Sequence, residues 1–372
     1  MFKKISFIFI FIILSSIRAN ALDTVAEYAV LIDATTNEVL FEKNAHEKMA
    51  PSSMSKMMTV YAILDALKQG EINIDNIVTH SENAWKQEGS RMFIPLGKQI
   101  TVDELLRGVI IQSGNDAAVS LAELLSGSEQ EFANRLNVHA KKLNLLNSSF
   151  VNATGLPNDN HYTTAYDLAK IAQYTIKNFP EHYALYSEKD YTYNGIKQAN
   201  RNILLSTFEG VDGLKTGHTD KAGYGLTSSA IKDGRRLIAV VNGLSTNRLA
   251  AQESEKLLKY GYSHFKINEI AKKAQVLGEA VVQNGEQSKL EIITLEDIII
   301  NTERAKDIKI TYRVNIKAPL IAPITKNAEV GKIEVIDEEQ KLLKEFPAYA
   351  KSEIKKAGIF KKIGRQFLDI FR

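Results

Sequence analysis

The chain has 372 residues, of which 44% are hydrophobic and 24% are charged, so it is a folded protein large enough for more than one domain and is neither collagen-like nor disordered. Its net charge of +3 falls to zero without the three cations of residues 1–21, which leaves no global basic field, and no nucleic-acid partner is predicted. The absence of cysteine excludes disulfides, thiolate nucleophiles and cysteine-based zinc or iron-sulfur sites.

Residues 1–21 have the pattern of a secretory signal peptide. Lys3 and Lys4 precede an apolar run from Ile5 to Leu14, and a small-x-small pattern ends at Ala21. The run is well short of the ~20 residues that cross a bilayer, which argues against the alternative of a transmembrane anchor. We therefore predict export of the protein, with cleavage after Ala21.

Residues 22–264 predict an α+β domain in which helices flank an antiparallel sheet. Strands are expected at residues 28–32, 38–41, 225–231 and 236–241. Helices are expected at residues 57–67, 105–111, 117–125, 168–176 and 249–262. Thr101 and Glu104 form a capping box ahead of the second helix, and Asp233-Gly234 forms the tip of the later hairpin. Strands at both ends of a helical middle favour this fold class.

The remaining residues predict two further parts. Alternating and β-branched runs over residues 265–348 indicate a small all-β domain. Residues 349–372 are expected to form an amphipathic helix, because apolar residues from Ile359 to Phe371 recur at helical spacing opposite a lysine-rich face. The last 22 residues carry seven Lys or Arg against two acids, so we predict that this helix lies on a membrane surface. The alternative is a terminal helix that packs on the protein's own core.

Three polar motifs occur in an order that points to one chemistry. Ser53-Met-Ser-Lys56 opens the first helix, Ser113-Gly-Asn115 lies between two helices, and Lys215-Thr-Gly217 precedes the later hairpin. A trio of this kind resembles the signature of penicillin-binding proteins and class A β-lactamases, although those have Ser-Asp-Asn in the middle. Ser-x-x-Lys recurs elsewhere in this chain, so the prediction rests on the ordered combination of the three motifs.

The spacing of these residues suits nucleophilic catalysis by serine. Ser53 and Lys56 are nearly one helical turn apart, so the amine can reach the hydroxyl and take its proton if the pKa of the amine is lowered. Burial and a second cation, Lys215, would both lower that pKa. Ser113 could relay a proton to the leaving group, and Asn115 could hold a substrate amide. Each residue taken singly also has a structural alternative, as a helix cap, a solvated lysine or a turn.

The second half of the constellation suits a carboxylate substrate. Lys215 and Thr216 offer donors for a carboxylate, and Gly217 allows a substrate backbone to lie close. The backbone N–H groups of Ser53 and His218 are candidates for an oxyanion hole.

Beyond these motifs, the sequence resembles the D-alanyl-D-alanine carboxypeptidases, the low-molecular-mass penicillin-binding proteins. The resemblance covers nearly the whole chain and includes the stretches 50–59, 113–118, 154–156, 200–202 and 212–223. It implies a β-lactamase/transpeptidase-like fold followed by the small β domain and the C-terminal amphipathic helix. It also implies a serine enzyme that trims the terminal D-alanine from peptidoglycan stem pentapeptides. Penicillins and other β-lactams are then expected to inhibit the enzyme by acylating its serine.

The resemblance also assigns roles to particular residues. It implies Ser53 as the acylated nucleophile, Lys56 as the general base and Ser113 in proton transfer. It implies that substrate is bound by Asn115, Lys215, Thr216, Gly217, His218, Arg201 and Arg248. No metal and no cofactor is predicted. The expected location is the periplasmic face of the bacterial cytoplasmic (inner) membrane, with peripheral attachment through the C-terminal helix.

Other functions use the same residues. A β-lactamase would hydrolyse the penicillin acyl-enzyme rapidly, although Ser-Gly-Asn favours the carboxypeptidase. A D,D-endopeptidase would cut crosslinks instead of tails. A non-catalytic penicillin-binding scaffold is the alternative from a different class, and the complete set of chemical residues argues against it.

Overall fold

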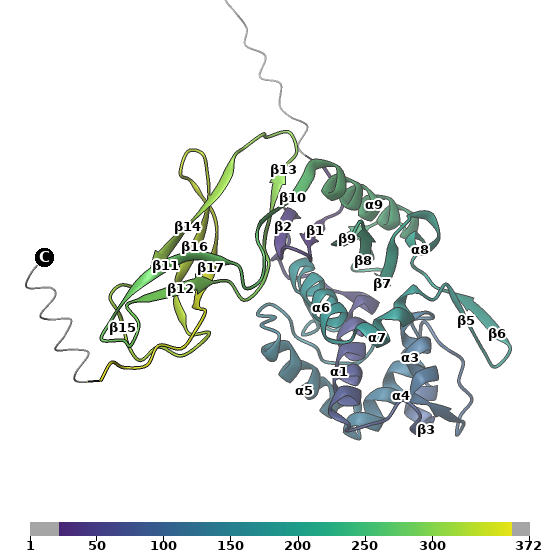
Figure 1. Cartoon of the computed structure of the whole chain (residues 1–372). Coiled ribbons are helices and arrows are strands. Elements are labelled where there is room, and N and C mark those ends of the chain that lie inside the picture. Colours follow the sequence, from purple (N-terminus) through teal and green to yellow (C-terminus); the bar gives the residue numbers. More distant parts are fainter. Residues whose placement is uncertain (1–21, 359–372) are drawn as a thin grey trace, which may run out of the picture.

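The first domain is built on a five-stranded antiparallel sheet. The computed structural model describes residues 22–358, and the predicted signal peptide at residues 1–21 lies outside them (Figure 1). The strand order is β2-β1-β9-β8-β7. The strands are β1 (Tyr28–Asp33), β2 (Glu38–Lys43), β7 (Val211–Thr219), β8 (Gly223–Lys232) and β9 (Arg235–Leu244). Asp233 and Gly234 both have positive φ, as the tight turn between β8 and β9 requires, and the predicted hairpin is confirmed.

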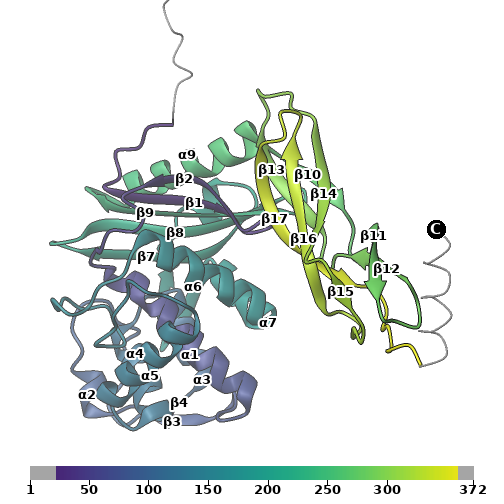
Figure 2. The same ribbon diagram turned by 90° about the vertical axis from the view of Figure 1, so that its left-hand side faces the viewer.

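Helices cover both faces of this sheet. Nine helices lie among residues 22–264: α1 (Lys56–Gln69), α2 (Glu82–Trp85), α3 (Val102–Ile110), α4 (Asn115–Ser126), α5 (Glu129–Lys142), α6 (Ala165–Asn178), α7 (Pro180–Tyr183), α8 (Leu204–Thr207) and α9 (Asn247–His264). Successive residues of β9 point to opposite faces. Ile238 packs with the helical core that includes α1 and α6, whereas Leu237 packs against α9. Figure 2 shows α9 on one side of the sheet and α6 on the other.

Helix α1 lies at the centre of the domain. Its residues from Lys56 to Leu64 are all buried, so it is surrounded by other elements instead of presenting a polar face to water. A 3-10 helix, η1 (Ser52–Ser55), leads into it. The capping box at the start of α3 is confirmed, because Thr101 and Glu104 exchange side-chain and backbone hydrogen bonds. Helix α5 was not predicted from the sequence.

Smaller elements connect the helices. The pairs β3 (Ile77–Thr79) with β4 (Gln99–Thr101) and β5 (Asp190–Tyr193) with β6 (Ile196–Ala199) form two-stranded sheets at the periphery. A second 3-10 helix, η2 (Ala184–Ser187), follows α7. The predicted fold class, an antiparallel sheet flanked by helices and followed by a β domain, is confirmed.

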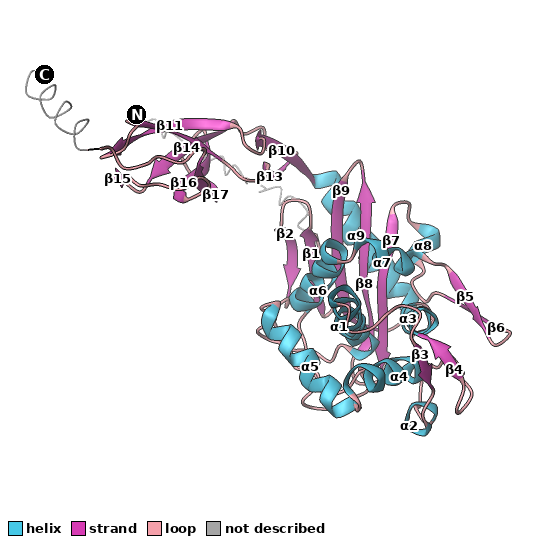
Figure 3. Ribbon diagram, turned by 60° about the horizontal axis from the view of Figure 1, so that its bottom comes forward, coloured by secondary structure: helices cyan, strands magenta, loops and turns pink. Residues whose placement is uncertain are grey.

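The second domain contains strands but no helix within the described part of the chain (Figure 3). Its strands are β10 (Phe265–Ala271), β11 (Val276–Gln283), β12 (Lys289–Ile293), β13 (Ile298–Glu303), β14 (Ile310–Ile316), β15 (Leu320–Ile321), β16 (Glu329–Asp337) and β17 (Leu342–Ala350). Six of them form a sheet in the order β14-β16-β17-β12-β11-β15, and β10 pairs with β13. This domain has its own hydrophobic core, which includes Ile292, Ile300 and Ile333.

The end of the described chain differs from the prediction. Tyr349 and Ala350 belong to β17, and Ile354 is buried and pairs with Ile324, so residues 349–357 continue the β domain where a helix was expected to begin. The apolar face of the predicted helix begins at residue 359 and lies outside the described residues. No helix within residues 22–358 is long and apolar enough to cross a membrane.

The arginine of a buried ion pair in the first domain also contacts the β domain. Arg235 donates to the carboxylate of Asp33 at 2.7 Å, and both side chains are buried. The same guanidinium donates to the carbonyls of Gly261 and Phe265 and to the side chain of Asn301 on β13. Because these partners come from the first domain, the domain junction and the β domain, one side chain links all three.

We predict that Asp33→Asn lowers the free energy of unfolding by about 3 kcal/mol, because it leaves the buried guanidinium of Arg235 without its counter-charge. Urea unfolding followed by circular dichroism measures this change. The control is Asp190→Asn, which breaks the exposed ion pair with Lys197 and should cost less than about 1 kcal/mol. Equal effects of the two variants would contradict a structural role for the buried pair.

Candidate active site

The serine of the first motif contacts the lysine of the same motif. Ser53 lies in η1 and Lys56 opens α1, which places the two side chains one turn apart. Lys56 Nζ donates to Ser53 Oγ at 3.0 Å and to the carbonyl oxygen of Thr154 at 2.6 Å. Ser53 is half-buried, whereas Lys56 is 0% exposed. The amine is therefore held against the hydroxyl by the surrounding core.

The environment of Lys56 favours its neutral form. Burial, together with the charge of Arg201, lowers the pKa of this amine from its usual value to about 7. The carboxylates of Asp116 and Glu129 act in the opposite direction. A neutral amine can donate to Thr154 while its lone pair accepts the proton of Ser53.

A serine of the second motif contacts a lysine of the third motif in the same way. Ser113 lies between α3 and α4 with a positive φ, and Lys215 lies on β7. Lys215 Nζ donates to Ser113 Oγ at 2.9 Å. Burial lowers the pKa of Lys215 well below its usual value, and the charges of Lys56 and Arg201 lower it further. The site thus contains two serine hydroxyls, each hydrogen-bonded to a buried lysine.

The start of α4 shapes the wall beside Ser113. Asn115 Nδ2 donates to the carbonyl of Glu88 at 2.5 Å, while its buried Oδ1 has no hydrogen-bond partner within the described residues. The carboxylate of Asp116 accepts the backbone N–H groups of Met92 at 2.8 Å and Phe93 at 2.9 Å. These bonds fix the loop before β4. A buried amide oxygen without a partner, such as that of Asn115, is unusual in a folded protein.

Two glycines allow other segments to approach the turn that carries Ser53. Gly155 has a φ of +80°, and a Cβ there would lie 1.9 Å from the carbonyl oxygen of Ser52. A Cβ on Gly217 would lie 2.8 Å from the carbonyl oxygen of Pro51. Glycine is required at both positions because the backbone itself fills the space.

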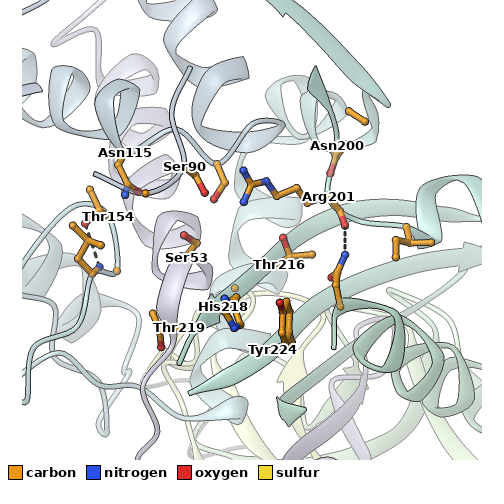
Figure 4. A pocket seen from close by; sticks show the side chains of 18 residues that line it. Ser53, Ser90, Asn115, Thr154, Asn200, Arg201, Thr216, His218, Thr219 and Tyr224 are labelled. Atoms are coloured by element: carbon orange, nitrogen blue, oxygen red, sulfur yellow. Dashed lines mark hydrogen bonds between the residues drawn. The ribbon is translucent and has the colours of Figure 1, made fainter. Parts of the chain in front are cut away.

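The three motifs surround one cavity of about 700 Å³ (Figure 4). Of the predicted residues, those that line it are Ser53, Ser113, Asn115, Arg201, Thr216, Gly217 and His218. Lys56 and Lys215 are buried behind this lining and reach it through the two serines. Arg248 is exposed and is not part of the lining, although its neighbour Asn247 is and donates to the carbonyl of Arg201 at 3.2 Å.

Several residues of the cavity were given no role from the sequence. Thr154 holds Lys56 through its carbonyl, and a backbone carbonyl leaves no side-chain signal. Ser90 lines the cavity from the loop that Asp116 fixes. Tyr224 stacks on His218 with ring centroids 3.8 Å apart. The signal for Tyr224 is the register of β7 and β8, because Tyr224 on β8 lies opposite His218 on β7. Residues 22–358 contain no group of three or more His, Asp or Glu arranged to hold a metal ion.

A serine next to a buried lysine, between a sheet edge and a helical region, places the protein among the serine peptidases of the penicillin-binding type. The sequence profile of the D-alanyl-D-alanine carboxypeptidases matches residues 15–246, and that of the penicillin-binding protein 5 C-terminal domain matches residues 265–356. The chain belongs to the D-alanyl-D-alanine carboxypeptidase family. The family inferred from the motifs is thereby confirmed.

Two of three similar proteins cover about nine tenths of this chain, and the third covers about two thirds. The D-alanyl-D-alanine carboxypeptidase DacF of Bacillus subtilis (strain 168) is 39% identical over 347 residues, which cover 92% of this chain and 89% of DacF. The structure of penicillin-binding protein 5 from Haemophilus influenzae has a TM-score of 0.86 at 35% identity and covers 90% of this chain and 99% of its own. Penicillin-binding protein D2 of Listeria monocytogenes, solved in an ampicillin-bound form, has a TM-score of 0.60 at 31% identity over 65% of this chain and 99% of its own.

Proposed function

We propose that the protein is a serine-type D-Ala-D-Ala carboxypeptidase that removes the terminal D-alanine from peptidoglycan stem pentapeptides through an acyl-enzyme on Ser53. The observation that carries the assignment of the nucleophile is the contact of 3.0 Å between Ser53 Oγ and the buried Nζ of Lys56. A serine hydroxyl needs a base within this reach to become a nucleophile. Family membership supports the reaction and the class of substrate.

In the proposed acylation, the oxygen of Ser53 attacks the carbonyl carbon of the penultimate D-alanine, and neutral Lys56 accepts the proton of the Ser53 hydroxyl. The negative oxygen that forms is stabilised by the backbone N–H groups of Ser53 and His218. Ser113, which is hydrogen-bonded to Lys215, then gives its proton to the leaving amine. The proton that Lys56 took from Ser53 is transferred to Ser113, so that Lys56 is neutral again. Water then attacks the resulting ester while Lys56 takes a proton from the water, and Lys56 returns this proton to the oxygen of Ser53 as the ester bond breaks and the shortened peptide leaves.

Charge and unpaired polar atoms support the orientation of the substrate. The terminal carboxylate is proposed to lie near Arg201 and Thr216, on one side of Ser53 in Figure 4. Asn115 Oδ1 would accept the substrate amide N–H. The guanidinium of Arg201, which lines the cavity, would attract this carboxylate. Arg248 lies outside the cavity lining, so its assignment to the substrate carboxylate has the weakest support.

Penicillins are proposed to acylate the same serine, as the ampicillin-bound relative supports. We further propose that the protein is exported and attaches to the periplasmic face of the cytoplasmic membrane through residues 359–372. The apolar and lysine-rich pattern of these residues supports that location.

We predict that Ser53→Ala abolishes both the penicillin adduct and the release of D-alanine, with activity reduced at least about 10³-fold, because within residues 22–358 only the hydroxyl of Ser53 is hydrogen-bonded to Lys56. Mass spectrometry with a penicillin and product analysis of a pentapeptide measure the two losses. The control is Ser263→Ala, since Ser263 and Lys266 repeat the Ser-x-x-Lys pattern outside the cavity. An adduct that persists in Ser53→Ala would rule out the nucleophile.

The pKa of Lys56 gives a pH dependence. Below about pH 7 the amine is protonated and cannot accept the proton of Ser53, so the rate constant for acylation by a penicillin should rise about tenfold per pH unit and level off above pH 7. Stopped-flow measurement from pH 5 to 9 tests this. Arg201→Gln should move the midpoint upward, because it removes a charge that lowers this pKa. A rate independent of pH in the wild type would exclude Lys56 as the base.

A chain that ends at Gly358 should no longer bind membranes, because it lacks the proposed amphipathic segment. It should still fold, because it retains Ile354 and the other residues that pack on the β domain. Cosedimentation with vesicles that contain anionic lipids measures binding. The truncated protein should cleave a small pentapeptide at the rate of the full chain. Binding of both proteins to the vesicles would contradict the assignment of the anchor.

A further inference from the structure

A second cavity adjoins the one that contains Ser53. It has a volume of about 420 Å³ and shares the lining residues Gly155, Leu156 and Thr219 with the first cavity, so the two lie side by side. Arg201 and Thr216 lie on one side of Ser53, whereas Thr154 and Thr219 lie on the other side (Figure 4). Thr219 also lines the second cavity. A substrate whose carboxylate lies near Arg201 therefore extends toward the second cavity with the residues that precede the scissile bond.

The inner part of the second cavity is a fixed structure. His161 is buried, and its Nδ1 accepts the backbone N–H of Val151 at 3.2 Å, which leaves Nε2–H to donate to Ser55 Oγ at 2.7 Å. Burial lowers the pKa of His161 to about 4, so this ring remains neutral. Across the cavity, the hydroxyls of Ser52 and Thr219 are hydrogen-bonded at 3.1 Å. The neutral interior leaves charge recognition to the rim.

The rim carries one anion and one cation. Asp159, on the loop after Thr154, and Lys221, on the turn after β7, both line the cavity and form an ion pair at 3.0 Å. Their side chains are 93% and 73% exposed, and neither has another hydrogen bond or ion pair within the described residues. An exposed pair of this kind contributes little to stability. Both charges are therefore available to a ligand that carries the complementary pair.

We propose that this second cavity binds the side chain of the residue that precedes the penultimate D-alanine, and that Asp159 and Lys221 select a side chain that ends in an amino-acid zwitterion. The ligand's ammonium would pair with Asp159 and its carboxylate with Lys221. A side chain that ends in an ammonium alone leaves Lys221 unpaired. Acylation of that ammonium, as in a crosslink, leaves Asp159 unpaired. This inference rests on the proposed carboxypeptidase function.

Three pentapeptides that differ only at the third residue test the subsite. In the first peptide, the side chain of this residue ends in a carbon that carries both an ammonium and a carboxylate. In the second it ends in an ammonium alone, as in lysine, and in the third it ends in an acetylated amine without charge. The wild-type kcat/KM should be about threefold to fivefold higher for the zwitterion than for lysine, as expected for one exposed ion pair. This preference should shrink in high salt. Lys221→Gln should bring the ratio to about one, and Asp159→Asn should lower kcat/KM for the zwitterion relative to the neutral peptide.

The control is Asp190→Asn, which breaks an exposed ion pair outside both cavities and should retain the wild-type ratio. A wild-type ratio of one, or a ratio that is unchanged in Lys221→Gln, would overturn the subsite. Failure of the wild type to cleave any of the three peptides would instead contradict the proposed function. Cleavage of all three peptides at equal rates would contradict the subsite alone.

Discussion

The site depends on keeping an amine out of water while it touches a hydroxyl. Lys56 belongs to the most buried helix of the first domain, and its Nζ has hydrogen bonds to Ser53 and to the carbonyl of Thr154. Burial of an ammonium is costly, so the surrounding core shifts the equilibrium toward the free amine. The same packing that stabilises α1 therefore supplies a base that is half neutral at about pH 7. Fold stability and chemical reactivity cannot be separated at this residue.

The cations of the site influence one another across the cavity. Arg201 lowers the pKa of Lys56, and Lys56 and Arg201 both lower that of Lys215. Only Asp116 and Glu129 act in the opposite direction on Lys56. The guanidinium of Arg201 lines the cavity, so an incoming carboxylate meets a positive charge there. Such a site favours anionic substrates before any directional hydrogen bond forms.

The sequence predicted the parts of the molecule that have periodic or motif signals. The apolar spacing around α1, the capping box at Thr101 and the Asp233-Gly234 hairpin all specify local structure. The order of the three motifs also indicated one site. Helix α5 was missed because few of its residues are apolar, and the carbonyl of Thr154 has no side-chain signature. Lysines near residue 355 resembled a helix face, although the buried Ile354 ties that segment to the β domain.

The position of Ser53 is fixed from two sides by backbone alone. Gly155 packs against the carbonyl of Ser52, and Gly217 packs against the carbonyl of Pro51, so the loop after Asn152 and strand β7 both press on the turn that leads into η1. Asn152 Oδ1 accepts the N–H of Gly155 at 2.7 Å and holds that loop in place. A side chain at either glycine would displace the turn, and with it the nucleophile, by more than a hydrogen bond tolerates. Gly155 and Gly217 therefore determine the precision of the Ser53–Lys56 contact as directly as the lysine itself.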